Sequence, residues 1–252
     1  MNFFISILGG LIGILLAIGI VWAIIYCKLR ATLGNVKMRE LRTAMSNAKD
    51  IEKQNYARNK NVVGMTNLLE PVILKDFPEF NRNLLFSKCE NNLRKILNCI
   101  EYKDISVIKN DPDFVYIEPK LYEQISDMKS NNTEEKFDNI EFNRSAISGY
   151  TKENGKATIK VSTSLSYYYK TNRKDKKSFD GLKKQTRYTS KFIYVYDESK
   201  FDTEQVSFSL HCQNCGAPIR SLKESACEYC MAPVQRINFK AWKMASYKED
   251  YN

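Results

Sequence analysis

The chain has 252 residues and a mass of 29.3 kDa, with a formal net charge of +10 and a mean hydropathy of −0.44. This length suits one or two small domains. The hydrophobic fraction of 43% excludes a wholly disordered chain, and the negative hydropathy excludes a protein with many membrane spans. The sequence contains seven cysteines but one histidine, His211. Histidine-based triads and multi-histidine metal sites are therefore disfavoured unless a partner chain supplies further residues.

The first predicted element is an uncharged run from Phe3 to Tyr26. As a helix it would be about 36 Å long, which is enough to cross a hydrocarbon core of about 30 Å. A secretory signal peptide fits less well, because no basic residue precedes the run and no cleavage site with small residues follows it. A lipoprotein anchor at Cys27 is disfavoured by the bulky Tyr26 before it. We therefore predict residues 1–27 to be a transmembrane anchor.

Basic residues follow this run and none precedes it, which predicts an N-terminus outside the cell and a cytoplasmic C-terminal domain at the cell membrane. Residues 28–66 carry nine basic and three acidic residues and are predicted to form a basic helical linker. Its cations are candidate contacts to anionic lipid or to a partner, and the alternative is a solvated helix that only sets topology. The candidates are Lys28, Arg30, Lys37, Arg39 and Arg42. A stripe of small residues at Gly9, Gly13 and Ala17 would allow two copies of the anchor to pack.

Two helices are predicted at the start of the soluble part. Between residues 67 and 81, Pro71 and Pro78 are expected to break regular structure. From residue 83 to 99 apolar residues recur every three or four positions, which predicts a helix with one core-facing stripe. Cys89 and Cys99 fall in this segment and are expected to be small buried residues. A second helix is predicted to start after Pro119.

The hydrophobic period then changes from helix to strand. Residues 138–150, 157–169 and 188–196 are predicted strands, and Asn154 with Gly155 supplies a turn between the first two. Helices followed by antiparallel strands predict an α+β domain over residues 67–205, with the helices on one face of a curved sheet. Such a sheet can enclose a pocket, for which we consider Tyr167, Tyr169, Tyr188 and Tyr194 as lining residues. The alternative is that these tyrosines belong to the core.

A second basic cluster separates the last two of these strands. Eight basic residues lie between Lys170 and Arg187, which we interpret as a long hairpin loop. Lys174, Lys176 and Lys177 are candidate contacts to phosphate, lipid or an acidic partner, and a solvated loop is the alternative. Nucleic-acid binding is disfavoured, because no pattern of base-stacking aromatic residues accompanies the charge.

The most specific motif is a pair of C-x-x-C sequences, which are separated by 11 residues. Cys212, Cys215, Cys227 and Cys230 predict one structural Zn2+ ion with four thiolate ligands and no open coordination position. Gly216 permits a tight turn after Cys215, whereas Met231 takes the matching place in a less suitable second turn. Ile237, Phe239 and Ala241 then predict a strand that ties this ribbon to the main sheet. Residues 206–252 are accordingly assigned to a zinc ribbon with a C-terminal strand.

Several segments together resemble one known family. They are residues 70–71, 75–81 and 137–140, then Gln185 with Thr186, the strand at 194–196, and the motifs at 212–219 and 227–230. In this order they resemble the Tim-forty-four-like domain of bacterial membrane-anchored proteins with a C-terminal zinc ribbon. The resemblance implies a nuclear-transport-factor-two-like cone with a cavity between sheet and helices. It also implies a link to protein transport, because mitochondrial relatives tether an import-motor chaperone to the inner membrane and bind acidic lipid.

These patterns favour a non-enzymatic, membrane-tethered binding or scaffold module. It would recruit a protein or peptide at the cytoplasmic face of the membrane. One alternative is that the cavity of the cone binds a small molecule or serves an enzyme, and another is nucleic-acid binding through the ribbon and the basic loop. The scarcity of histidine speaks against catalysis.

Overall fold

The computed structural model describes residues 15–28, 30, 38–62, 64–109, 111–197, 212, 214–217, 226–233 and 240–250. The chain divides into two compact units, Met1–Glu52 and Lys53–Asn252. The predicted linker spans the border between them, because α2 (Met38–Ala57) begins in the first unit and ends in the second. This range of the predicted linker is helical.

The first unit also holds a helix over residues 15–28, which covers the second half of the predicted membrane span. The first half of that span lies outside the described residues, as do Gly9 and Gly13 of the predicted packing stripe. Among the described residues, no helix has both the length and the apolar character that a membrane crossing requires. The anchor and its packing stripe therefore stay predictions.

Three helices open the second unit: α3 (Thr66–Asp76), α4 (Arg82–Tyr102) and α5 (Glu118–Ser130). The predictions of α4 and α5 are confirmed, and the side chain of Asn81 caps α4 by accepting a hydrogen bond from the backbone N–H of Leu84. The expected break at Pro71 is wrong, because α3 continues through it. Tertiary contacts outweigh the proline here: Thr66 and Met65 hydrogen-bond to the backbone of Ile147 at the start of the helix.

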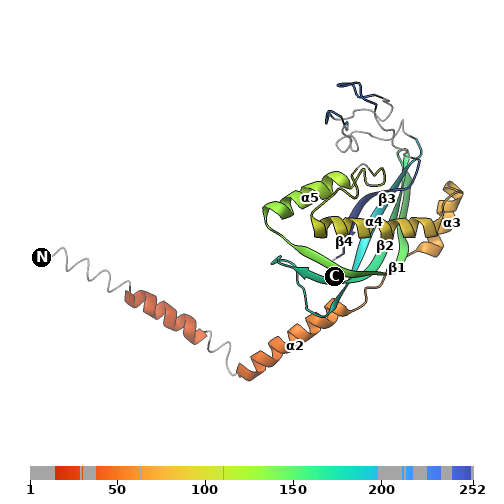
Figure 1. The fold of residues 1–252 in the computed structure, drawn as a ribbon. Coiled ribbons are helices and arrows are strands. Elements are labelled where there is room, and N and C mark those ends of the chain that lie inside the picture. The colour runs from red at the N-terminus through yellow and green to blue at the C-terminus, as the bar shows by residue number, and fades with distance from the viewer. Residues whose placement is uncertain are drawn as a thin grey trace. The chain divides into compact units, whose positions relative to one another are not determined.

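Four antiparallel strands follow in the order β1-β2-β3-β4, and α4 lies across the sheet (Figure 1). They are β1 (Glu135–Glu153), β2 (Lys156–Thr171), β3 (Lys183–Val195) and β4 (Lys243–Glu249). The turn at Asn154 and Gly155, both with positive φ, joins β1 to β2. Helices followed by an antiparallel sheet confirm the predicted α+β class.

The C-terminal strand lies further along the chain than its pattern indicated. Ala241 and Trp242 precede it, and β4 begins at Lys243, while residues 237–239 lie outside the described part. β4 pairs with β3 and buries Met244 completely, so the main sheet is completed by residues from the end of the chain. The segment with the cysteine motifs is thus inserted between two neighbouring strands of one sheet.

One hydrophobic core lies between the helices and the face of the sheet that they cover. Its fully buried members include Leu93 and Ile96 from α4, Leu121 from α5, Ile159 from β2 and Phe192 from β3. Burial of each such side chain stabilises the fold by about 1.5–3 kcal/mol. Cys89 and Cys99 are also buried in this core, as expected. Burial raises the pKa of Cys89 to about 11, so this thiol stays protonated.

The opposite face of the sheet, which we call the outer face, receives the end of the linker. The backbone carbonyl of Asn61 accepts a hydrogen bond of 3.0 Å from Arg187 on β3. Gly64 lies against Ala146 on β1 so closely that a Cβ atom there would be 2.3 Å from the alanine Cβ. Between these points Ser162 and Ser164 on β2 are 3% and 5% exposed. The linker therefore crosses the outer face over small side chains, and its last residues belong to the domain.

Candidate functional site

The two C-x-x-C motifs form two loops with the same backbone hydrogen bonds. In the first loop the N–H of Gly216 donates to the Cys212 carbonyl, and in the second the N–H of Met231 donates to the Cys227 carbonyl, at 2.8 and 2.9 Å. In each loop the N–H of the first cysteine also donates to an alanine carbonyl five residues later. Gly216 has a φ of 73° and Met231 a φ of 58°. The second loop therefore reaches the same turn as the first, despite its methionine.

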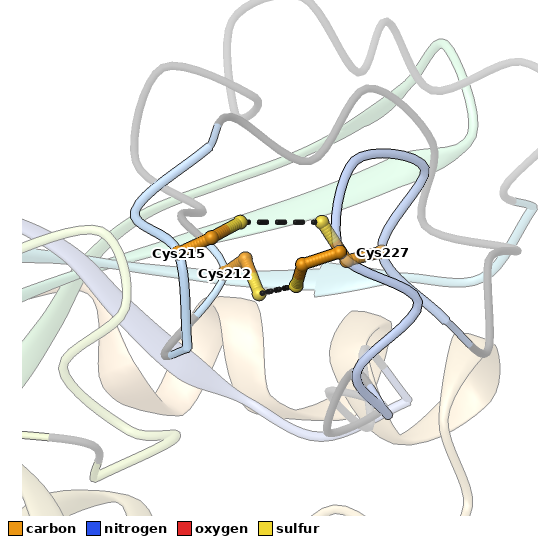
Figure 2. Close-up of side chains that lie close together, drawn as sticks. Cys212, Cys215 and Cys227 are labelled. Carbon is orange, nitrogen blue, oxygen red and sulfur yellow. Dashed lines mark hydrogen bonds between the residues drawn. The ribbon is translucent and has the colours of Figure 1, made fainter.

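The sulfur atoms of the two loops face one another (Figure 2). Cys212 Sγ lies 3.6 Å from Cys230 Sγ, and Cys215 Sγ lies 3.7 Å from Cys227 Sγ. All four sulfurs lie within 4.8 Å of one another, and all four cysteines are free. In a tetrahedron with metal–sulfur bonds of about 2.3 Å, the sulfurs would be about 3.8 Å apart. The four cysteines are thus close enough to hold a metal ion, and together they fill a four-coordinate shell.

The thiols of this cluster do not titrate alike. A hydrogen bond with the side chain of Asn214, and further bonds with Ala232 and Cys215, lower the pKa of Cys230 to about 6. A backbone hydrogen bond from Ala217 lowers the pKa of Cys215, but bonds with the other thiols outweigh it and raise that pKa to about 12. Clustered thiols lose their protons in steps, because the first thiolate opposes the next. A cation removes this repulsion, so metal binding here releases protons.

The basic cluster between β2 and β3 has a different environment from the one its sequence suggested. The loop is shorter than predicted and covers residues 172–182, since β3 already begins at Lys183. Among the described residues, at least five of the eight basic residues form ion pairs with carboxylates of the same domain. These pairs are Arg173 and Lys176 with Glu135, Lys183 with Glu141, Lys184 with Glu249, and Arg187 with Asp250.

Glu135 is the centre of the tightest of these clusters and was not identified from the sequence. Its side chain is 2% exposed and accepts hydrogen bonds from Lys176 Nζ, Arg173 Nη1 and the Tyr169 hydroxyl, at 3.0, 3.3 and 2.9 Å. Burial, and then the nearby Glu135 charge, raise the pKa of Tyr169 above its usual range. Among the predicted partner contacts in the loop, Lys176 therefore binds Glu135 of its own domain. Lys174 is exposed, as is Lys177, which has an interaction of its own.

The basic loop and the end of α5 border an open hollow of about 520 Å³. Its lining is mostly amide, hydroxyl and charged groups, which come from Gln124, Asp127, Met128, Asn131, Thr133, Asn172, Arg173, Lys174 and Asp175. The Asn172 side chain holds this rim together, because it accepts from the N–H of Glu134 and donates to the carbonyl of Asn132, both at 2.8 Å. The hollow thus has a fixed rim and a polar surface.

The four tyrosines considered as pocket-lining residues lie mainly in the core. Tyr167, Tyr169 and Tyr188 are 0%, 2% and 5% exposed, and Tyr194 is half-buried against Phe77 and Trp242. The ring of Tyr167 lies near the Nζ of Lys184, at 5.7 Å from the ring centroid. The tyrosines thus help to form the inner layer beneath the paired cations, and their role as cavity lining stays a prediction.

The predicted juxtamembrane contacts are only partly described. Lys28 and Arg30 are exposed, and Arg42 is exposed on α2. Arg39 lies in α2, while Lys37 lies outside the described residues, as does His211. Their contact with lipid stays a prediction.

No protein-family model matches this chain, and no curated protein matches it. Fold and site therefore define the chain by class, as an α+β domain with a four-cysteine cluster that can hold a metal ion.

Proposed function

We propose that the four-cysteine cluster holds one structural Zn2+ ion in a small ribbon. Zinc prefers four soft ligands in tetrahedral geometry, and the two sulfur pairs have the spacing that zinc–thiolate bonds require. Four protein ligands leave no position for water or substrate. The ion would therefore stabilise the ribbon instead of performing chemistry. In a reducing cytoplasm the thiols would stay available for metal.

We further propose that the protein is a non-enzymatic binding or scaffold module, tethered to the cell membrane by its N-terminal segment. The domain would lie on the cytoplasmic side and recruit a protein or peptide. The observation that carries this proposal is that the carboxylates of Glu135 and Glu249 are engaged inside the domain, whereas a polar hollow on its surface is open. The carboxylates of Glu135 and Glu249, whose side chains are 2% and 9% exposed, are each held by a lysine and a hydroxyl group, and the four cysteines lie together. A hollow with polar walls remains open for a partner.

The order of the elements supports, at a coarse level, the resemblance to the Tim-forty-four-like domain and its cone. Three helices precede an antiparallel sheet, and the cysteine cluster comes late in the chain. A role in protein transport and contact of the basic linker with acidic lipid are proposals that follow from this resemblance.

Catalysis in the cavity of the proposed cone is the main alternative, and Glu135 is the carboxylate that would act as its general base. A general base must reach the proton that it removes, with one lone pair free for that purpose. Glu135 instead contacts two cations and a tyrosine hydroxyl, so we assign it a structural role. For nucleic acid, the pairing of Arg173 and Lys176 with Glu135 further reduces the charge available in the loop.

The zinc proposal is tested by metal analysis of the purified full chain, with one zinc per chain as the expected result. Retention of that zinc in Cys215→Ser would overturn the four-thiolate assignment.

The recruitment proposal is tested by photo-crosslinking in native membranes. A photoreactive residue replaces Asp127 or Lys174 on the rim of the hollow, and Tyr122, exposed on the same helix α5 but not part of the lining, serves as the control. We expect a discrete protein adduct from the two rim positions and none from the control. Absence of any adduct at the rim, or the same adducts at Tyr122, would refute recruitment through the hollow.

A further inference from the structure

Three lysines lie side by side on the outer face of the sheet. Lys160 on β2 is directly opposite Lys191 on β3, and Lys248 on β4 is opposite Thr189, two residues from Lys191 on the same face. Directly opposite residues have Cβ atoms about 5 Å apart, and diagonal neighbours are about 7 Å apart. The three positions therefore form a row across three strands, which we call the lysine ladder.

The lysine ladder is exposed and has no carboxylate partner among the described residues. Asp250, two residues along from Lys248, is already held by Arg187 and Thr189. Like charges directly opposite each other destabilise a sheet. The ladder thus contrasts with the basic cluster between Lys170 and Arg187, in which five cations are paired with carboxylates of their own domain. It places unbalanced positive charge at a fixed spacing, on a rigid element.

The surroundings of the ladder indicate which kind of anion it fits. The neighbouring positions on this face are Gly149, Thr158, Thr189 and Ser246, together with Ile193, which is half-buried beside Lys191. Docking to a membrane surface usually adds insertion of apolar side chains to charge attraction, and single-stranded nucleic acid adds stacking on aromatic rings. No aromatic ring occupies these positions, and the half-buried Ile193 offers little apolar surface for insertion. Carboxylates on a polypeptide, supported by the hydroxyl groups of Thr158 and Ser246 beside the lysines, match this surface better.

We propose that the lysine ladder docks a carboxylate-rich segment of a partner protein. This inference rests on the proposed recruiting function and deepens it, because it names the chemistry of the partner and a surface apart from the hollow. The ladder supplies positive charges that complement the carboxylates, and the fixed spacing of its lysines sets how the segment aligns along it.

The test measures binding of a fluorescent oligoglutamate peptide to the purified full chain in neutral detergent at low ionic strength. The variant Lys160→Glu with Lys191→Glu should weaken binding by about tenfold or more, and adding Lys248→Glu should weaken it further. The matched control is Lys136→Glu with Lys170→Glu. These lysines are also directly opposite each other and exposed on the outer face, but Asp138 lies two residues from Lys136. Both double variants change the net charge equally, so general attraction affects them alike.

A control variant that loses as much binding as the ladder variant, or a ladder variant that binds normally, would overturn the proposal. It would also fall if vesicles containing phosphatidylglycerol, or an oligothymidylate, depended on the ladder and the peptide did not. The single variant Lys160→Glu separates docking from folding, because it replaces a repulsive cross-strand pair with an attractive one. We expect weaker peptide binding together with a melting temperature that does not fall. If crosslinking at the hollow fails but peptide binding still depends on the ladder, recruitment through the hollow alone is refuted. If crosslinking succeeds but peptide binding does not depend on the ladder, the ladder proposal alone is refuted.

Discussion

Met231 allows a direct test of how backbone conformation limits the proposed metal site. This residue and Gly216 occupy equivalent places in the two loops, with φ values of 58° and 73°. The left-handed conformation costs a residue with a side chain about 1–2 kcal/mol, whereas glycine adopts it freely. The Met231 side chain is 74% exposed, so its removal forfeits little packing. The sequence predicted a less suitable turn at Met231, and the structure shows that the methionine nevertheless adopts the left-handed conformation of Gly216.

The substitution Met231→Gly should therefore strengthen metal binding. Glycine removes the backbone strain of about 1–2 kcal/mol, but it also costs about 0.5–1 kcal/mol because it makes the unfolded chain more flexible. The net stabilisation of the folded ribbon is therefore about 0.5–1 kcal/mol. If the ribbon folds around zinc as proposed, this gain would appear as an affinity for zinc that is about two- to fivefold higher. The assay is competition for zinc between the full chain and a chromophoric chelator at fixed pH.

The reciprocal change provides the matched comparison. A Cβ atom at Gly216 would meet no heavy atom within 4 Å, so Gly216→Ala adds only the backbone penalty and should weaken binding by a similar factor. Ala232 does not have a positive φ, and Ala232→Gly should not strengthen binding. If Met231→Gly bound zinc no more tightly than the natural chain, or if Ala232→Gly gave the same gain, the conformational explanation would be refuted.

Three further outcomes are expected. Glu135→Gln leaves Lys176 without its charge partner and leaves Arg173 paired with Asp175 alone, so it should lower the free energy of unfolding in urea by about 2–3 kcal/mol. Glu134→Gln, at an exposed side chain, should change it by less than about 0.5 kcal/mol, and equal effects would contradict the role of Glu135. Burial raises the pKa of Glu249, but Lys184 and Thr186 lower it more, so that it lies below its usual value. The resulting stability is fully present above about pH 4.3 and is lost as the pH falls through the lowered pKa, and Glu249→Gln should remove this acid dependence of the urea midpoint. Cys215→Ser should speed hydrogen exchange at the cysteine loops but not in β4, whose Met244 is fully buried in the core; rapid exchange in β4 would show that the metal holds the last strand in place.

The helices and strands were largely predictable because their patterns are local. The three- and four-residue spacing of apolar side chains gave α4, and strict alternation gave β2, with Ile159 and Leu165 facing the core as expected. Pro71 misled because a proline weakens a helix locally, whereas α3 is fixed at its start by hydrogen bonds to Ile147, a residue far along the chain. The start of β4 was misplaced because alternation also occurs before Lys243, and only pairing with β3 decides where the strand begins.

For the candidate sites the same division applies. Cysteine spacing predicted which four side chains come together, since each C-x-x-C turn places its two sulfurs on one side of the same loop, and the four sulfurs do lie close enough to hold a metal ion. The pairing of charged residues could not be predicted from the sequence in this way. The basic run between Lys170 and Arg187 is plain in the sequence, but its partners Glu135, Glu141, Glu249 and Asp250 come from β1 and the end of the chain. The lysine ladder, in contrast, is inconspicuous in the sequence, because its members are far apart. Local order thus follows from the sequence directly, whereas the register of the strands decides which charges are neutralised and which remain for a partner.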